Sequence, residues 1–210
     1  MGAMQKFLEG YRGFRADYYT KHRAMLQKLM ARGQTPTAMM IACSDSRIDP
    51  SLKVGADPGD FFMVRNVANL VPPYQADGAY HGTSAAVEFA VQVLNIPNII
   101  VMGHAKCGGI GALIRHEEEA ATDFVASWMK MVEPARDRAI AVAGNATPEH
   151  IQRLVEQEAV KDSLTNLMTF PWVKERVLAG KLTLHGWYFD LEVGVLHIMD
   201  ASGAFKPAEG

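Results

Sequence analysis

Short apolar runs alternate with longer amphipathic segments along most of this chain. Apolar stretches of strand length predict buried strands over 37–43, 61–66, 98–104, 182–190 and 194–200. Apolar residues at helical intervals predict helices over 4–32, 82–95, 110–119, 121–142, 147–168 and 171–180. Strands alternating with helices indicate an α/β fold with a mostly parallel β-sheet flanked by helices. The short turn between the last two strands favours a hairpin at the edge of the sheet.

The N-terminal segment is unusually long and aromatic for a single helix. We expect residues 1–32 to form a helical arm and residues 33–210 to form an α/β core, together making one domain over 1–210. The arm is expected to pack on a second subunit. An ordinary amphipathic helix on its own core is the alternative that the pattern leaves open.

Composition narrows the classes of partner. The chain has 210 residues, of which 49% are hydrophobic, and its net charge is −2. This balance gives no electrostatic reason to expect nucleic acid or an anionic membrane as a partner. No apolar run approaches the roughly 20 residues that span a bilayer, and the first residues lack the apolar centre of a secretory signal. A cytoplasmic protein is therefore expected.

The two cysteines lie in chemically similar places. Cys43 ends one predicted strand, His104 ends another, and Cys107 follows three residues later. Carboxyl ends of parallel strands meet at one edge of a sheet, so these side chains are expected to converge. Two thiolates and one imidazole form a zinc ligand set. With only three protein ligands, the fourth position is open to water, whose pKa zinc lowers to about 7.

Two charged residues follow the first cysteine. On an extended segment, Asp45 shares a face with Cys43, and Arg47 lies two residues further along the same face. Arg47 is expected to keep the Asp45 carboxylate ionised and away from the metal, so that Asp45 accepts a hydrogen bond from zinc-bound water or hydroxide. If Arg47 releases it, Asp45 becomes a fourth ligand that closes the site. A plain ion pair at a strand end is the alternative.

These residues together resemble the β-class carbonic anhydrases, and most closely their plant-like branch. The resemblance rests on the motifs "CSDSR" (43–47), "RNVANLV" (65–71), "GHAKCGG" (103–109) and "GWYFD" (186–190). It implies one Zn²⁺ per subunit and reversible hydration of CO₂ to bicarbonate and a proton through zinc-bound hydroxide. It also implies a homodimer or homotetramer in which the N-terminal arm embraces a second subunit.

The same resemblance implies a substrate pocket. Gln34 matches a glutamine that contacts substrate from across the dimer. Phe62 and Val67 match apolar walls for CO₂, and the Gly108 backbone N–H is a candidate contact to a substrate oxygen. Phe89 stands where relatives often carry Tyr, so the hydroxyl that those relatives offer at this position is missing here.

Several alternatives remain open at this point. The same site could hydrolyse a CO₂ analogue such as COS or CS₂, could bind zinc without catalysis, or could be a redox pair, although the C-x-x-C spacing of redox centres is missing. Met40 replaces the Trp of the bicarbonate-inhibited branch, so no effector site is expected. His81, in a nearby loop, is a candidate proton acceptor, with an ordinary surface residue as the alternative.

Overall fold

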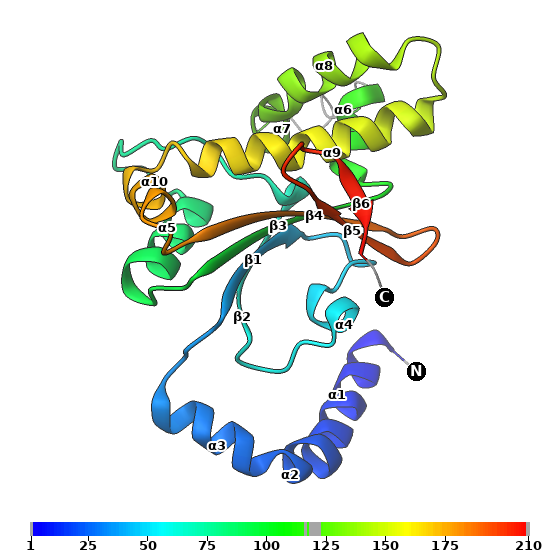
Figure 1. The fold of residues 1–210 in the computed structure, drawn as a ribbon. Coiled ribbons are helices and arrows are strands. Elements are labelled where there is room, and N and C mark those ends of the chain that lie inside the picture. Colours follow the sequence, from blue (N-terminus) through cyan, green and yellow to red (C-terminus); the bar gives the residue numbers. More distant parts are fainter. Residues whose placement is uncertain (1, 116, 118–122, 209–210) are drawn as a thin grey trace.

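One mixed β-sheet forms the centre of the molecule. The structure is a computed structural model that describes residues 2–115, 117 and 123–208. Within these residues, six strands form one sheet in the order β2-β1-β3-β4-β5-β6 (Figure 1). The strands are β1 (Ala38–Cys43), β2 (Phe61–Asn66), β3 (Asn98–His104), β4 (Thr183–Asp190), β5 (Val195–Met199) and β6 (Phe205–Pro207).

The four strands β2, β1, β3 and β4 run parallel, as the apolar runs predict. The burial predicted for 61–66 was wrong, because β2 is an edge strand whose residues are only partly buried or exposed. Cys43 pairs with Asn66 across β1 and β2, and His104 pairs with Phe189 across β3 and β4. These residues therefore lie at the carboxyl edge of the sheet. β4 and β5 form the predicted antiparallel hairpin, and β6, which no pattern predicted, pairs with β5.

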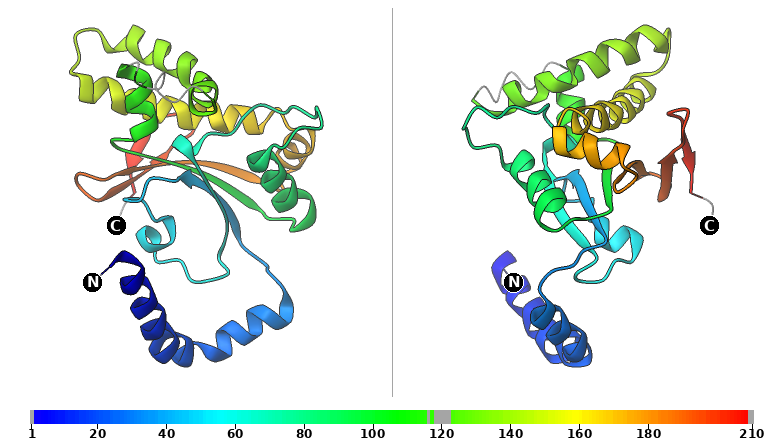
Figure 2. Two further views of the ribbon diagram at one scale, coloured as in Figure 1. Left: turned by 180° about the vertical axis from the view of Figure 1, so that it is seen from behind. Right: turned by 60° about the vertical axis from the view of Figure 1, so that its left-hand side comes forward.

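Helices cover the sheet and extend beyond it (Figures 1 and 2). The helices of the core are α4 (Pro50–Val54), α5 (Gly82–Glu88), α6 (Gly108–Arg115), α7 (Val125–Met129), α8 (Glu133–Ala143), α9 (Pro148–Leu167) and α10 (Pro171–Leu178). The shorter helical turns are η2 (Val67–Asn69), η3 (Phe89–Val93) and η5 (Lys130–Val132). The helix predicted over 82–95 thus changes to a π-helical turn at η3. Parts of the helices predicted over 110–119 and 121–142 lie outside the described residues. No helix among the described residues is long and apolar enough to cross a membrane.

The alternation of side chains along β1 builds a core on each face of the sheet. Met39 and Ile41 are fully buried against apolar residues of α5, α9 and α10. Met40 and Ala42 are fully buried on the opposite face, together with Ile48. A strand apolar on both faces is typical of the interior of a parallel sheet.

The longest helix, α9, begins as its sequence predicts. The Thr147 side chain accepts a hydrogen bond from the His150 backbone N–H at 3.3 Å, and Pro148 occupies the first helical position. The helix crosses the sheet, and its contacts with β3 and β4 bring its middle close to the carboxyl edge (Figure 1).

The N-terminal arm stands away from the sheet (Figure 2). It consists of α1 (Ala3–Gly13), the π-helical turn η1 (Phe14–Tyr18), α2 (Tyr19–Lys21) and α3 (Arg23–Arg32). The prediction of one helix over 4–32 was too simple, because the π-helical turn and a non-helical His22 divide it. No residue of these four elements is buried, and its exposed apolar side chains include Phe7, Leu8 and Tyr11.

Candidate metal centre

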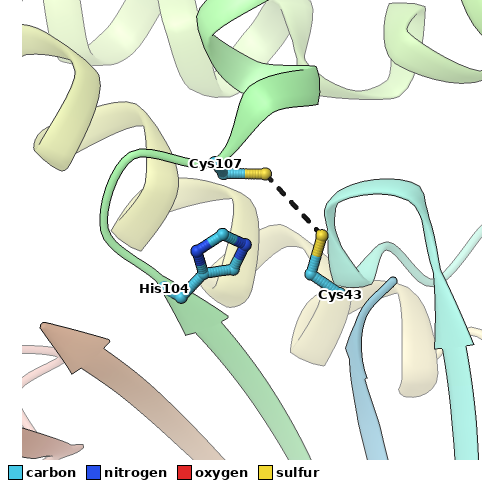
Figure 3. Close-up of side chains that lie close together, drawn as sticks. All are labelled: Cys43, His104 and Cys107. Carbon is cyan, nitrogen blue, oxygen red and sulfur yellow. Dashed lines mark hydrogen bonds between the residues drawn. The ribbon is translucent and has the colours of Figure 1, made fainter. Parts of the chain in front are cut away.

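Cys43, His104 and Cys107 meet at the carboxyl edge of the sheet (Figure 3). Cys43 ends β1, His104 ends β3, and Cys107 directly precedes α6. All three are buried, and their candidate ligand atoms lie within 4.8 Å of one another. The convergence predicted from the strand ends is therefore present.

The geometry of this cluster fits a tetrahedral zinc ion. Zinc bonds of about 2.3 Å to each sulfur would place two tetrahedral sulfurs about 3.8 Å apart. The Cys43 and Cys107 Sγ atoms are 3.9 Å apart. The His104 Nδ1–H donates to the Ala105 carbonyl at 2.9 Å, so the Nε2 atom carries the free lone pair. Nε2 is buried and has no hydrogen-bond partner within the described part of the chain. A metal ion bound to this nitrogen would supply the missing partner.

The two thiols do not ionise alike in the protein alone. A hydrogen bond from Cys107 lowers the pKa of Cys43 to about 4, and the neighbouring His104 ring adds to this effect against the opposing cost of burial. The same bond, with burial, raises the pKa of Cys107. The sulfur pair therefore keeps one proton at neutral pH. A divalent cation would displace this proton and bind both sulfurs as thiolates.

Asp45 and Arg47 form a bidentate ion pair beside the cluster. The Arg47 Nε donates to Asp45 Oδ1 at 3.0 Å, and the Arg47 Nη2 donates to Asp45 Oδ2 at 2.7 Å. Hydrogen bonds from Arg47 hold the pKa of Asp45 well below its usual value, so the carboxylate is ionised. The Asp45 N–H in turn donates to the Cys43 sulfur at 3.4 Å. The predicted dyad is thus assembled next to a candidate ligand.

Arg65 holds the loop that carries this dyad, and sequence reasoning missed it. Its guanidinium donates to the carbonyls of Cys43 and Asp45 at 2.8 and 2.7 Å, and also to that of Ile48. A second tie links the two ligand loops, because the Arg47 Nη2 also donates to the Lys106 carbonyl at 2.8 Å. The bonds of Arg65 and the bond from Arg47 to Lys106 form only once the loops are folded. The sole sequence signal for them is the position of Arg65 near the end of a predicted strand.

Glu156 is a second residue that sequence reasoning missed. It lies on α9, is only 1% exposed, and accepts a hydrogen bond from the Cys107 backbone N–H at 2.8 Å. Burial raises its pKa, against the hydrogen bonds that favour the charged form. Nothing in the local sequence distinguishes this glutamate from the other charged residues of α9.

Two of the predicted substrate residues lie beside the cluster. Gly108 is exposed and directly follows the candidate ligand Cys107. Apart from its chain neighbours and the backbone of its own helix, no atom of the described residues lies within 4 Å of the place that a Cβ atom would occupy there. The Val67 side chain lies against the same loop, because a Cβ atom at Gly109 would meet its Cγ1 at 2.9 Å. These positions suit an apolar wall and a backbone donor next to the candidate metal centre.

The other three predicted substrate residues lie elsewhere in the chain. Gln34 is exposed in the link before β1, nine positions before Cys43. Phe62 sits near the start of β2, opposite Met39, and its ring stacks on that of Phe89 with the ring centres 5.7 Å apart. At about 3.3 Å per residue, Phe62 lies roughly 13 Å along the strand from the level of the cluster. The chain does not bring these residues to its own metal centre.

A cavity of about 750 Å³ adjoins the site at Val67. Its lining includes Trp128 and the candidate proton acceptor His81. The His81 Nε2 lies 2.8 Å from the Asp77 carboxylate, so the ring is anchored from one side. Trp128 donates from its indole nitrogen to the Val67 carbonyl at 2.8 Å, fixing the wall between cavity and metal centre. The role of His81 remains a prediction.

Comparisons with known proteins agree on one family. Residues 38–196 match the family model described as carbonic anhydrase. "Beta carbonic anhydrase 5, chloroplastic" of Arabidopsis thaliana is 43% identical over 164 residues, which cover 78% of this chain and 54% of that protein. The chain thus spans about half the length of that curated relative.

Solved structures support the same assignment. The structure of the β-carbonic anhydrase CcaA matches with a TM-score of 0.92 and 34% identity, covering 99% of this chain and 100% of that one. Tetrameric β-carbonic anhydrases of Sordaria macrospora match with a TM-score of 0.79 and 26% identity, covering 97% of this chain and 98% of the other. This chain belongs to the β-class carbonic anhydrase family. The family expected from the sequence motifs is therefore confirmed.

Proposed function

We propose that this protein catalyses the reversible hydration of CO₂ to bicarbonate and a proton, with zinc held by Cys43, His104 and Cys107. The observation that carries the proposal is the buried convergence of two sulfurs 3.9 Å apart with an unpartnered imidazole Nε2. Zinc bound there would lower the pKa of a bound water to about 7 and so supply a nucleophile at neutral pH.

Asp45 supplies an oriented hydrogen-bond acceptor at this centre. Its Oδ1 accepts from the backbone and side chain of Arg47, whereas Oδ2 accepts, among the described residues, only from the Arg47 Nη2. A carboxylate oxygen has capacity for about two such bonds, so Oδ2 can accept a further one from the reacting water. Arg47 keeps the carboxylate ionised and turned toward itself, which prevents it from acting as a metal ligand.

Val67 and Gly108 position the substrate in the proposed pocket. CO₂ carries no charge, so an apolar surface at Val67 holds it without competing for the polar groups. The exposed Gly108 can offer its backbone N–H to a substrate oxygen, and the lack of a side chain leaves room for that approach. Holding a small substrate at attacking distance contributes much of the rate acceleration.

The pocket is completed by a second subunit. Gln34, Phe62 and Phe89 lie away from the metal centre of their own chain, so they would line the centre of a partner. The exposed apolar side chains of the arm supply a surface for such an association. The protein is thus a homo-oligomer, and a cytoplasmic location suits its free cysteines.

Mixing two defective variants tests this shared pocket. Cys43→Ser removes a metal ligand but leaves Gln34, and Gln34→Ala does the reverse. Hybrids should regain up to half the activity, because one of their two sites combines intact ligands with an intact glutamine. No recovery in demonstrated hybrids would place Gln34 outside the partner's site.

Stopped-flow kinetics test the activity itself. The protein with its metal is mixed with CO₂ or with COS, and turnover is compared together with zinc content. Rapid hydration of CO₂ with one zinc per chain is the expected result. Preferred turnover of COS, or full zinc without CO₂ hydration, would refute the proposed function.

A further inference from the structure

A buried carboxylate lies directly behind the metal centre and takes no part in the proposed chemistry. Glu156 is in the middle of α9, and only 1% of its surface is exposed. Burying a charged group costs several kcal/mol unless hydrogen bonds replace its water. A helix facing a sheet would ordinarily carry an apolar residue at such a position.

Within the described part of the chain, the Glu156 carboxylate accepts three hydrogen bonds. The Cys107 N–H and the Gln152 Nε2 each donate to its Oε1 at 2.8 Å. The Tyr188 hydroxyl donates to its Oε2 at 2.8 Å. The carboxylate therefore joins three elements at one point: α9, β4 and the loop that begins α6.

The loop at Cys107 needs such an anchor. Lys106 adopts a left-handed backbone conformation with φ of 56°, which costs energy for a residue other than glycine. Two glycines, Gly108 and Gly109, follow the cysteine and give that side of the loop little intrinsic stiffness. From α9, Glu156 holds the Cys107 N–H, while the Gln152 side chain donates to the Cys107 carbonyl at 3.2 Å. Both backbone polar groups of Cys107 are thus held by the same helix.

We propose that Glu156 is a positioning residue for Cys107: it fixes the backbone of this ligand, directs its sulfur to the metal and so slows the release of zinc. Tyr188 keeps the carboxylate in place from the opposite side. The inference rests on the proposed role of Cys107 as a zinc ligand. It assigns part of the retention of the metal to a residue outside the proposed ligand set.

Zinc release from three variants of the metal-loaded protein tests this proposal. Glu156→Gln keeps the shape of the side chain but replaces a charged acceptor with a neutral one. Tyr188→Phe removes one support of the carboxylate and leaves Glu156 in place. Glu158→Gln is the matched control, because Glu158 lies on the same helix and pairs with Lys161 and Arg138 rather than with Cys107.

Release is followed by transfer of zinc to a chromophoric chelator. Loss of a group that orients a metal ligand typically lowers metal affinity about 10- to 100-fold. Because the proposed effect lies in zinc release, Glu156→Gln should release zinc roughly 10- to 100-fold faster than the unaltered protein. Tyr188→Phe should show a smaller acceleration, and Glu158→Gln should show none. In cobalt-substituted protein, the thiolate-to-metal absorption band should change for Glu156→Gln and stay the same for Glu158→Gln.

Two results would overturn the proposal. One is release at the unaltered rate, or an unchanged cobalt spectrum, in Glu156→Gln. The other is an equal effect of Glu158→Gln. If Glu156→Gln does not fold, release of zinc from Tyr188→Phe at the unaltered rate would overturn the proposal in its place. Absence of zinc from the unaltered protein would instead refute the proposed function, so the two failures are distinguishable.

Discussion

Replacing Asp45 with Asn should separate activity from stability. The substitution keeps the size of the side chain and leaves Cys43, His104 and Cys107 in place. It removes the negative charge and turns one acceptor oxygen into an NH₂ group. We expect zinc to remain bound and CO₂ hydration to fall strongly.

The magnitudes follow from the contacts of the carboxylate. An Asn oxygen can still accept from the Arg47 backbone N–H and Nε, which lie 2.9 and 3.0 Å from Oδ1. The new NH₂ group would face the Arg47 Nη2 donor, so the 2.7 Å bond is lost. The Arg47 side chain is 52% exposed and the Asp45 side chain 14%, so water can replace the lost bond at Arg47 but less readily at residue 45. The loss in folding free energy should therefore be about 1–2 kcal/mol. Loss of the hydrogen-bond acceptor that orients the reacting water should instead lower kcat by about 10²-fold or more.

The assay combines stopped-flow hydration, zinc quantification and thermal unfolding. Asp49→Asn is the matched control, because the Asp49 side chain caps α4 and Asn serves equally well as a cap. It should leave all three measurements unchanged. Wild-type hydration by zinc-loaded Asp45→Asn would refute the dyad, and so would an equal loss in the Asp49→Asn control.

Three further predictions concern the metal ligands and the proton. Cys107→Ser should lose zinc, because one soft ligand is gone, and full occupancy measured by atomic absorption would remove Cys107 from the ligand set. In the metal-free protein, the thiolate absorbance near 240 nm should persist as the pH falls from 7 and should disappear only near pH 4. The reason is the lowered pKa of Cys43, which keeps the thiol ionised above that pH. A titration midpoint near the usual thiol pKa of about 8.5, or an unchanged titration in Cys43→Ser, would contradict this expectation. His81→Ala should lower kcat only in dilute buffer, with recovery on adding imidazole and with isotope exchange between CO₂ and bicarbonate unchanged; a loss independent of buffer would exclude His81 as the proton acceptor.

Two of the parallel strands could be predicted closely from the sequence. Phe61–Asn66 and Asn98–His104 match their predicted ranges. Asn98–His104 is largely apolar because it is covered on both faces, whereas Phe61–Asn66 is an edge strand whose residues are only partly buried or exposed. Strand β6 was missed because Phe205–Pro207 is too short and too polar to show a pattern. Helix α4 was also missed, although Asp49 before Pro50 is a recognisable start signal.

The metal centre could be predicted for a similar reason. Cys43 and His104 end strands, and the topology of a parallel sheet brings strand ends together. Glu156 could not be predicted, because it is one of several charged residues on α9 and only the packing of that helix against β3 and β4 buries it. The residues expected to form one pocket also lie in two separate places within the chain. Val67 lies at the metal centre and Phe62 does not, which motif matching alone could not distinguish.

The most direct test of the central claim is X-ray absorption at the zinc edge of the purified protein. Two sulfurs at about 2.3 Å and one imidazole nitrogen at about 2.0–2.1 Å are expected, together with one further light atom. Zinc should be present at one ion per chain. A shell without sulfur, a shell of four sulfurs, or the absence of zinc would contradict the assignment of Cys43, His104 and Cys107 as the ligands.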